Sequence, residues 1–461
     1  MKLSSIEVPE FGISQLQPII EEKIFNERLD NLKEKLLKEN YGCAIIYADR
    51  EHFANMHYIS NFDPRFEEAI LIINLEEDES ILITGPENQG YSAVSKINIK
   101  KINYPTFGLL SQDRSAKINI EELFNDSIKI KNKKIGIVGW KYFTNDEFKQ
   151  PDKQFDIPHY ILQSIQNIVE DINLINNITH WFNNPSNGFR IQNELDELAL
   201  MEYSSCHTSN SLKNVIKNLK VGVSEFEAAS NFKPIGIPLS CHLMLSSGER
   251  VKYGLSSPSS KIIKKGEPFA AAYGVWGSLN CRVGWIAENE NDLPINVRDY
   301  FDKLVKPYCN AVKRWYENIG IDVYGGKIYE TVMDILGDPF YGVELNPGHL
   351  IHKDEWLSSP IFHKSKIKFK SRQAIQMDII PATNSEYFSS NLEDGIFLLD
   401  ESDRSLFSKQ YPEAMDRIIK RREFMINKLG INLKPEVMPL SNIPAVISPF
   451  LLNFENIVEF K

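Results

Sequence analysis

The sequence has 461 residues, of which 42% are hydrophobic and 25% are charged, a composition typical of a globular protein with sizeable cores. The formal net charge of −10 argues against nucleic acid or an anionic membrane surface as the main partner. The first residues lack the basic and apolar regions of a signal peptide, and no apolar run approaches the roughly 20 residues of a membrane helix. Because the five cysteines are scattered and without metal spacing, we expect a cytoplasmic protein with reduced thiols.

The first part of the chain alternates helical and strand patterns. Apolar residues recur at helical spacing over 19–39, and short apolar runs at 43–47, 69–73, 80–83 and 134–139 predict strands. This alternation indicates an α/β N-terminal domain over residues 1–182. The stretch 183–188, rich in Asn, Pro, Ser and Gly, then predicts a linker.

The second part of the chain, residues 190–432, predicts a separate domain. A long helix opens near residue 193, and Ser224 is a credible cap for a second helix. A strand pair within 266–282, helices over 295–336 and strands over 373–401 follow. Residues 433–461 form an apolar, Pro-containing extension, which we expect to pack back on the fold or on a neighbouring subunit.

Four segments of the second domain form an ordered set. They are 266–282, Asn346–Trp356 (NPGHLIHKDEW), Met377–Pro381 (MDIIP) and Asn391–Gly395 (NLEDG). Their order and spacing resemble the pita-bread hydrolases, a family that includes Xaa-Pro aminopeptidase, prolidase, methionine aminopeptidase and the metal-free creatinase. The resemblance covers roughly residues 190 to 430, and the segment before it resembles the creatinase-type N-terminal domain. It implies an α+β C-terminal domain with a curved, mostly antiparallel sheet.

The resemblance also assigns positions to the metal ligands of this family, which are two Asp, one His and two Glu. Position by position, these ligands correspond to Ala272, Cys281, His349 (with His352 as the competing placement), Asp378 and Glu393. Divalent ions need hard oxygen ligands, yet no Asp or Glu occurs between Glu267 and Glu288. The further His of this family is also missing near Val251–Gly254. We therefore predict a protein without the dinuclear metal site and without a cofactor.

The candidate catalytic residues are His349, His352, Asp378 and Glu393. Imidazole suits proton transfer near neutral pH, and two neighbouring carboxylates can divide the roles of acid and base. Either His could instead be structural, and the two acids could instead form salt bridges with Arg282 or Arg372.

Four further residues are candidates for substrate binding: Arg65, Arg282, Trp276 and Trp356. Arg65 could hold a substrate carboxylate bidentately, Arg282 could supply the counter-charge that metals do not, and the two Trp rings could wall a pocket. Pairing of Arg65 with Glu67 or Glu68, and core packing of the Trp rings, are the alternatives. Cys281 beside Arg282 could be a thiolate nucleophile, although a small buried residue filling the place of a lost Asp is the stronger interpretation.

Three functions remain open at this level. The first is a metal-independent hydrolase of the Xaa-Pro peptidase/creatinase type, which acts on a C–N bond of a small or dipeptide-like substrate. The second is a catalytically silent pseudo-peptidase that binds a small ligand. The third is an Xaa-Pro dipeptidase or aminopeptidase with an altered or single-metal site. The resemblance to creatinase-like dimers, in which N-domain residues reach the partner's site, predicts a homodimer.

Overall fold

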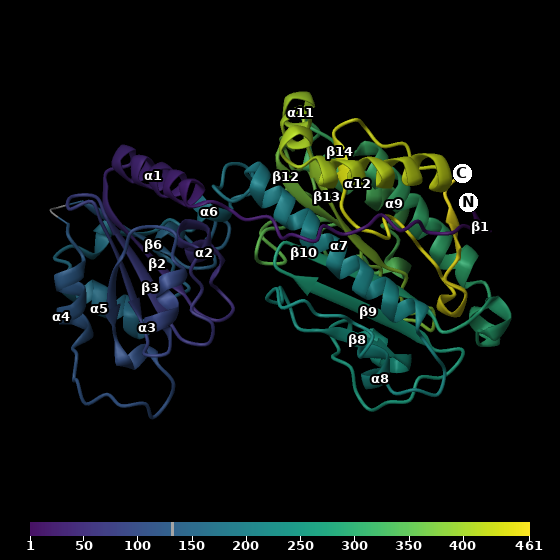
Figure 1. Cartoon of the computed structure of the whole chain (residues 1–461), viewed down its shortest axis with the longest axis horizontal. Helices are drawn as coiled ribbons and strands as arrows, with labels where there is room; N and C mark the ends of the chain where they lie inside the picture. The colour runs from purple at the N-terminus through teal and green to yellow at the C-terminus, as the bar shows by residue number, and fades with distance from the viewer. Residues whose placement is uncertain (131–132) are drawn as a thin grey trace. The chain divides into compact units, whose positions relative to one another are not determined.

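The computed structural model describes residues 1–130 and 133–461, and these residues form two compact units. One unit consists of Ile20–Arg190, and the other of Met1–Ile19 together with Ile191–Lys461. Figure 1 shows the helices and strands of both units. In the part of the chain that is described, no helix is both long enough and apolar enough to cross a membrane.

The described residues of the unit Ile20–Arg190 form a six-stranded sheet in the order β5-β4-β3-β2-β6-β7. The strands are β2 (Tyr41–Ala48), β3 (Ala69–Asn74), β4 (Glu79–Thr84), β5 (Lys100–Asn103), β6 (Lys134–Val138) and β7 (Ile175–Asn177). The helices are α1 (Glu22–Lys38), α2 (Ala54–Ser60), α3 (Asn88–Tyr91), α4 (Ile120–Ser127), α5 (His159–Ile168) and α6 (His180–Asn183). The helix and strands predicted from periodicity are all present, and the mixed parallel and antiparallel pairing makes this an α/β unit.

The other unit is built on a seven-stranded sheet in its described residues, with the order β11-β12-β13-β10-β9-β8 and β14 beside β13. Its strands are β8 (Met244–Ser247), β9 (Pro268–Val275), β10 (Ser278–Trp285), β11 (His349–Leu350), β12 (Gln373–Asp378), β13 (Leu392–Leu398) and β14 (Val437–Pro439). The strand pairs among the described residues of this sheet are antiparallel. This arrangement confirms the α+β class that the resemblance implies.

Helices pack on this sheet through buried apolar side chains. They are α7 (Leu195–Lys217), α8 (Glu225–Ala229), α9 (Lys306–Asn318), α11 (Glu401–Gln410) and α12 (Pro412–Glu423). A further helix, α10 (Gly325–Leu336), packs against α9. The long helix α7 lies against β9 and β10 (Figure 1). Ser224 caps α8 as predicted, because its Oγ accepts the backbone N–H of Glu227 at 3.1 Å.

The first nineteen residues belong with the C-terminal unit, which differs from the domain expected over residues 1–182. The reason is strand pairing, since β1 (Lys2–Ser5) pairs antiparallel with β15 (Asn456–Glu459). Phe11 then packs edge-on against Phe424, with ring centroids 5.9 Å apart. The same pairing shows that the C-terminal extension packs back on its own fold.

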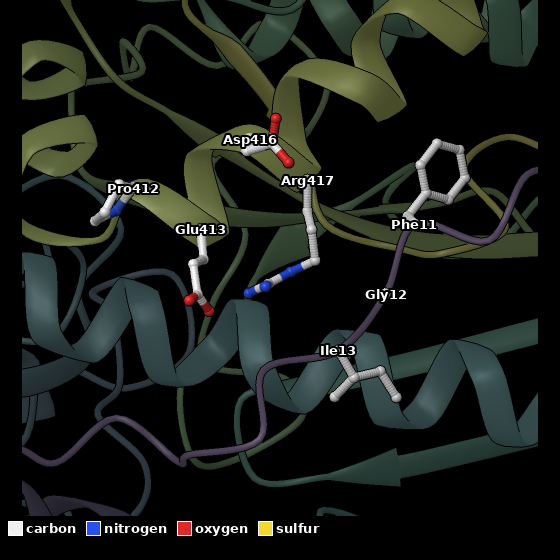
Figure 2. Close-up of a pocket in the computed structure, with 7 residues that line it drawn as sticks. All are labelled: Phe11, Gly12, Ile13, Pro412, Glu413, Asp416 and Arg417. Atoms are coloured by element: carbon white, nitrogen blue, oxygen red, sulfur yellow. The ribbon is translucent and has the colours of Figure 1, made fainter.

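A cavity of about 450 Å³ lies where this N-terminal segment passes α12. It is lined by Phe11–Ile13 and by Pro412, Glu413, Asp416 and Arg417 (Figure 2). Arg417 extends from α12 toward α7, where its Nη2 donates to Oε2 of Glu202 at 2.6 Å. Both side chains of this ion pair are buried, so the pair ties α12 to α7 beneath the segment.

Candidate functional site

One face of the seven-stranded sheet carries a row of side chains across five strands. Strand pairing aligns Met244 with Ala272, Ala272 with Cys281, Cys281 with Glu393, and Glu393 with Asp378. Residues paired in this way point to the same face, with Cβ atoms about 5 Å apart. The row is therefore apolar over β8, β9 and β10 and acidic over β13 and β12. The two positions that the resemblance assigns to lost aspartates stand beside the two acids that remain.

His349 joins the acidic end of this row from β11. Its Nε2 lies 3.1 Å from Oε1 of Glu355 and 3.7 Å from Oε1 of Glu393. One ligand atom each from His349, Asp378 and Glu393 lie within 4.8 Å of one another. The predicted convergence of these three side chains is therefore confirmed, and all three are buried.

A short loop after β11 adds two side chains to this group. The ring of Trp356 stacks on the ring of His349, with centroids 4.1 Å apart and planes inclined by 17°. Glu355 supplies the carboxylate nearest to the imidazole. Trp356 was predicted as a site residue and Glu355 was not. The signal was available, because Glu355 belongs to the same unusual segment of two His, two acids and a Trp.

Gln376 is a second residue of this group that was not among the candidates predicted from the sequence. Its Nε2 donates to Oε1 of Glu393 at 3.0 Å and to the backbone oxygen of Leu279 at 2.7 Å. It is paired with Gly395, and a Cβ at that glycine would lie 2.7 Å from Oε1 of Gln376. The missing side chain of Gly395 thus makes room for the amide that orients Glu393. Because Gln376 is two residues from Asp378 on one strand, period-two alternation would have placed it on this face.

Burial and charge set the protonation of the group in opposite directions. Burial lowers the pKa of His349, but the carboxylates of Glu355 and Glu393 outweigh it and hold that pKa well above its usual value. Burial raises the pKa of Asp378 to about 7, although the neighbouring His349 opposes this. Burial and then the charge of Asp378 raise the pKa of Glu393 well above its usual value. Burial also acts to raise the pKa of Glu355, but His349 outweighs it and leaves that pKa lowered.

Together, these four pKa shifts define the distribution of charge in the group. An imidazolium at His349 faces an ionised Glu355, Glu393 retains its proton, and Asp378, with a pKa of about 7, gains and loses its proton near neutral pH. Two atoms of the group, Nε2 of His349 and Oδ1 of Asp378, are buried without an aligned hydrogen-bond partner among the described residues. The ring's other nitrogen, Nδ1, lies 3.2 Å from the backbone oxygen of Leu350, which can only accept a hydrogen bond. Nε2 is therefore the nitrogen that faces the carboxylates.

Cys281 lies in the row, but its surroundings oppose the thiolate. Burial and the charges of Glu393 and Asp378 raise its pKa well above the usual value, and the opposing charge of Arg282 does not outweigh them. Asn391 Nδ2 is 3.7 Å from the sulfur. The structure therefore favours a space-filling residue at the place of a lost Asp.

We expect Cys281 to resist alkylation in the folded protein. The thiolate is the reactive form, and a pKa well above 9 leaves little of it at pH 8. Mass spectrometry of peptides after brief iodoacetamide treatment would measure this, with protein unfolded in guanidinium as the control in which Cys281 reacts fully. Fast labelling of folded Cys281 would contradict this description of its surroundings.

Arg282 is not part of this group. Successive strand residues point to opposite faces, so Arg282 points away from the face that carries Cys281. Its Nη2 lies 2.8 Å from Oδ2 of Asp394, and its Nε donates to the backbone oxygen of Val446 at 2.8 Å. Both charged side chains are buried. Arg282 was a candidate for substrate binding, and the structure instead places it in a buried ion pair with Asp394.

Three other predicted residues lie away from the row or in the other unit. Trp276 lies in the two-residue turn between β9 and β10, four residues along the strand from Ala272. The side chain of His352 faces α7, with its Nε2 4.0 Å from Oε2 of Glu197. Arg65, in the unit Ile20–Arg190, adopts a left-handed backbone with φ of 58°. Its Nη2 donates to the hydroxyl of Tyr91 at 2.6 Å, and its Nε lies 3.3 Å from Oδ1 of Asp63.

The donor set does not fit a dinuclear metal centre. Ala272 offers no donor atom, and the raised pKa of Cys281 disfavours the thiolate that would be needed there. A single ion is a better match, since His349, Asp378 and Glu393 offer three ligands and two orphan atoms. Ligands about 2.1 Å from a zinc ion lie no more than about 4.2 Å apart, so a separation of up to 4.8 Å requires a small inward shift.

Solved structures share this fold, whereas no family model and no curated protein matches the sequence. A prolidase from Thermococcus sibiricus superposes with a TM-score of 0.63 at 16% identity, over 82% of this chain and 95% of the other. An Xaa-Pro dipeptidase from Bacillus anthracis gives 0.60 at 13% identity, over 82% and 96%. An X-Pro aminopeptidase from Thermotoga maritima gives 0.61 at 14%, over 81% and 95%. The chain therefore has the pita-bread fold of the Xaa-Pro peptidases, and at these identities the likeness establishes the fold alone.

Proposed function

We propose that this chain is a peptidase-like hydrolase that acts on a C–N bond of a small, dipeptide-sized substrate without a dinuclear metal site. The observation that carries the proposal is the position of His349, whose Nε2 faces Glu355 and Glu393 while its ring rests on Trp356. An imidazole held between carboxylates can move a proton at a defined atom. The fold shared with Xaa-Pro dipeptidases and prolidases supports a peptide-like substrate.

The proposed reaction uses the group as an acid and a base. A water molecule attacks the carbonyl carbon and gives its proton to Asp378 in its ionised form, which a pKa of about 7 makes available at neutral pH. Oδ1 of Asp378 has no aligned partner among the described residues. His349 then donates a proton from Nε2 to the departing nitrogen, and the C–N bond breaks. Asp378 returns a proton to the imidazole through water, so that the enzyme is regenerated. The ionised Glu355, 3.1 Å from Nε2, stabilises the positive charge on the ring.

The apolar half of the row is proposed to receive the hydrocarbon part of the substrate. Cys281 lies directly beside Glu393, and Ala272 and then Met244 continue the row on the next two strands. A scissile bond over the acids would place its neighbouring group over these residues. Arg65 remains a candidate for the substrate carboxylate, in a homodimer that brings it to its own or its partner's site. Its exposed side chain supports that role.

A single divalent ion is the second candidate, and the compact set of His349, Asp378 and Glu393 favours it. When bound, such an ion would polarise the carbonyl and lower the pKa of a water. His349 and the two acids would then hold the ion, and Glu355 would remain beside the imidazole of His349. The absence of a donor at Ala272 nevertheless leads us to expect purified protein without stoichiometric divalent metal.

We expect His349→Ala to lower kcat by about 100-fold or more, because it removes the proposed proton donor. Release of amino acids from a panel of Xaa-Pro dipeptides would measure this, with and without a chelator and alongside elemental analysis. His363→Ala is the matched control, since the exposed His363 contacts Tyr329 instead. Full activity of His349→Ala would contradict the mechanism, and loss of wild-type activity on chelation would favour the single ion. Thermal stabilisation by dipeptides without any turnover would replace the proposal with a silent binding protein.

A further inference from the structure

The loop Ile351–Leu357 presents different side chains on its two sides. It is closed at its base, where the N–H of Leu350 donates to the oxygen of Ser358 at 2.7 Å and the N–H of Leu357 donates to the oxygen of Leu350 at 3.0 Å. On one side it carries Glu355 and Trp356, which contact His349. The tip of the loop therefore decides where a carboxylate and an aromatic ring meet the imidazole.

On its other side the loop meets the first turn of α7. Lys353 Nζ lies 2.6 Å from Oε1 of Glu197, and both side chains are almost completely buried. His352 approaches the other carboxylate oxygen at 4.0 Å. Glu197 lies in the first turn of α7, where the helix dipole favours a negative charge. A buried charge that loses its partner is costly, so this pair resists separation.

We infer that Glu197 and Lys353 are positioning residues, which fix Glu355 and Trp356 against His349. Glu355 follows Lys353 by two residues, a span of at most about 7 Å of backbone. Anchoring Lys353 on the rigid helix α7 therefore restricts the place of Glu355 and the stacked ring of Trp356. This inference rests on the proposed function. If His349 transfers a proton, the ion pair of Lys353 with Glu197 matters for the rate, because a misplacement of about 1 Å at a reacting group costs about 100-fold.

The test is Lys353→Met, which keeps the length and apolar stem of the side chain but removes the bond to Glu197. The readout is acrylamide quenching of Trp356 fluorescence, isolated by subtracting the Trp356→Phe form of each protein. Trp356 is already half-buried rather than fully buried, and we expect quenching to increase about twofold as the ring leaves His349 and becomes more accessible. Where a dipeptide is turned over, kcat should fall about 100-fold while KM is unchanged.

Glu202→Gln is the matched control, because it weakens another buried ion pair of the same helix, with Arg417, away from the loop. A purely structural role for Lys353 predicts that both substitutions change stability and that neither changes Trp356. That outcome would overturn the inference. Should Lys353→Met fail to fold, the double substitution Glu197→Met/Lys353→Met removes both charges and keeps the volume. Unchanged quenching in a folded double variant would overturn the inference equally.

The fluorescence readout does not depend on catalysis. An inactive wild-type protein would contradict the proposed function. The quenching of Trp356 would still show whether the Lys353–Glu197 ion pair keeps the Trp356 ring against His349. Conversely, an active protein with unchanged quenching in Lys353→Met would keep the function and discard the anchor.

Discussion

Aspartates introduced together at positions 272 and 281 should give this chain a dinuclear metal centre. The pairing of Ala272 with Cys281, and of Cys281 with Glu393, places both new carboxylates in line with the two existing acids. Together with His349 they complete the five-ligand set that the pita-bread resemblance assigns. Carboxylates in such a set suit manganese or cobalt, whereas the natural pair offers only a methyl group and a neutral thiol.

Elemental analysis and calorimetric titration with Mn²⁺ would measure this gain. We expect about two ions per chain in A272D/C281D and no more than one in the wild type. Without metal the double variant should be less stable by about 3–5 kcal/mol, because two buried carboxylates then lack a partner. Metal at about 100 times its dissociation constant should restore about 2.7 kcal/mol.

A matched control separates geometry from charge. A270D/C281D also adds two carboxylates. Strand alternation keeps position 270 on the same face as Ala272, but two residues along β9 and therefore further from Glu393. It should bind fewer ions than A272D/C281D. Equal metal binding by the two variants, or none by either, would show that the row does not place these positions around a common centre.

Arg282→Met should destabilise the C-terminal unit by about 3–5 kcal/mol, since it leaves the buried carboxylate of Asp394 without its cation. For a unit of this size that corresponds to a fall of roughly 10 °C in its unfolding midpoint. Differential scanning calorimetry would measure it. Ligand affinity of the folded fraction should be unchanged, because Arg282 points away from the row.

Arg372→Met is the comparison for this prediction. Arg372 also pairs with an aspartate, Asp403, but its side chain is 37% exposed, so the expected loss is only about 1 kcal/mol. Replacing both members of the buried pair, in R282M/D394L, should recover much of the lost stability. A stable Arg282→Met with weakened ligand binding would return Arg282 to the site.

Much of the fold could be predicted from the sequence because its signals are periodic. Helical spacing in 19–39 and apolar runs at 69–73 and 80–83 match α1, β3 and β4. The ordered segments around Ala272, Cys281, His349, Asp378 and Glu393 fix positions on neighbouring strands, which is why the row and the His349 group could be predicted. Such a frame places backbones, and side chains follow from strand alternation.

The features that could not be predicted from the sequence depend on contacts between residues that are distant in sequence or lie on different faces of a strand. Arg282 is adjacent to Cys281 in sequence, and that adjacency suggested a shared site although alternation separates them. The composition of its segment makes Glu355 a candidate, but its contact with His349 depends on a loop that folds back, and no periodic pattern encodes that return. The first strand, β1, is four residues long, and its partner, β15, is too distant in sequence for local patterns to indicate the pair.

That pairing also has a kinetic consequence. Ser4 and Glu459, which hydrogen bond across β1 and β15, are 455 residues apart in sequence. The whole unit Ile20–Arg190 lies between them, so it is complete in sequence long before the pairing can form. Closing so long a loop costs entropy, and contacts of large sequence separation slow folding. The two units should therefore acquire structure in sequence, with Ile20–Arg190 first and the two-stranded sheet of β1 and β15 in the other unit last.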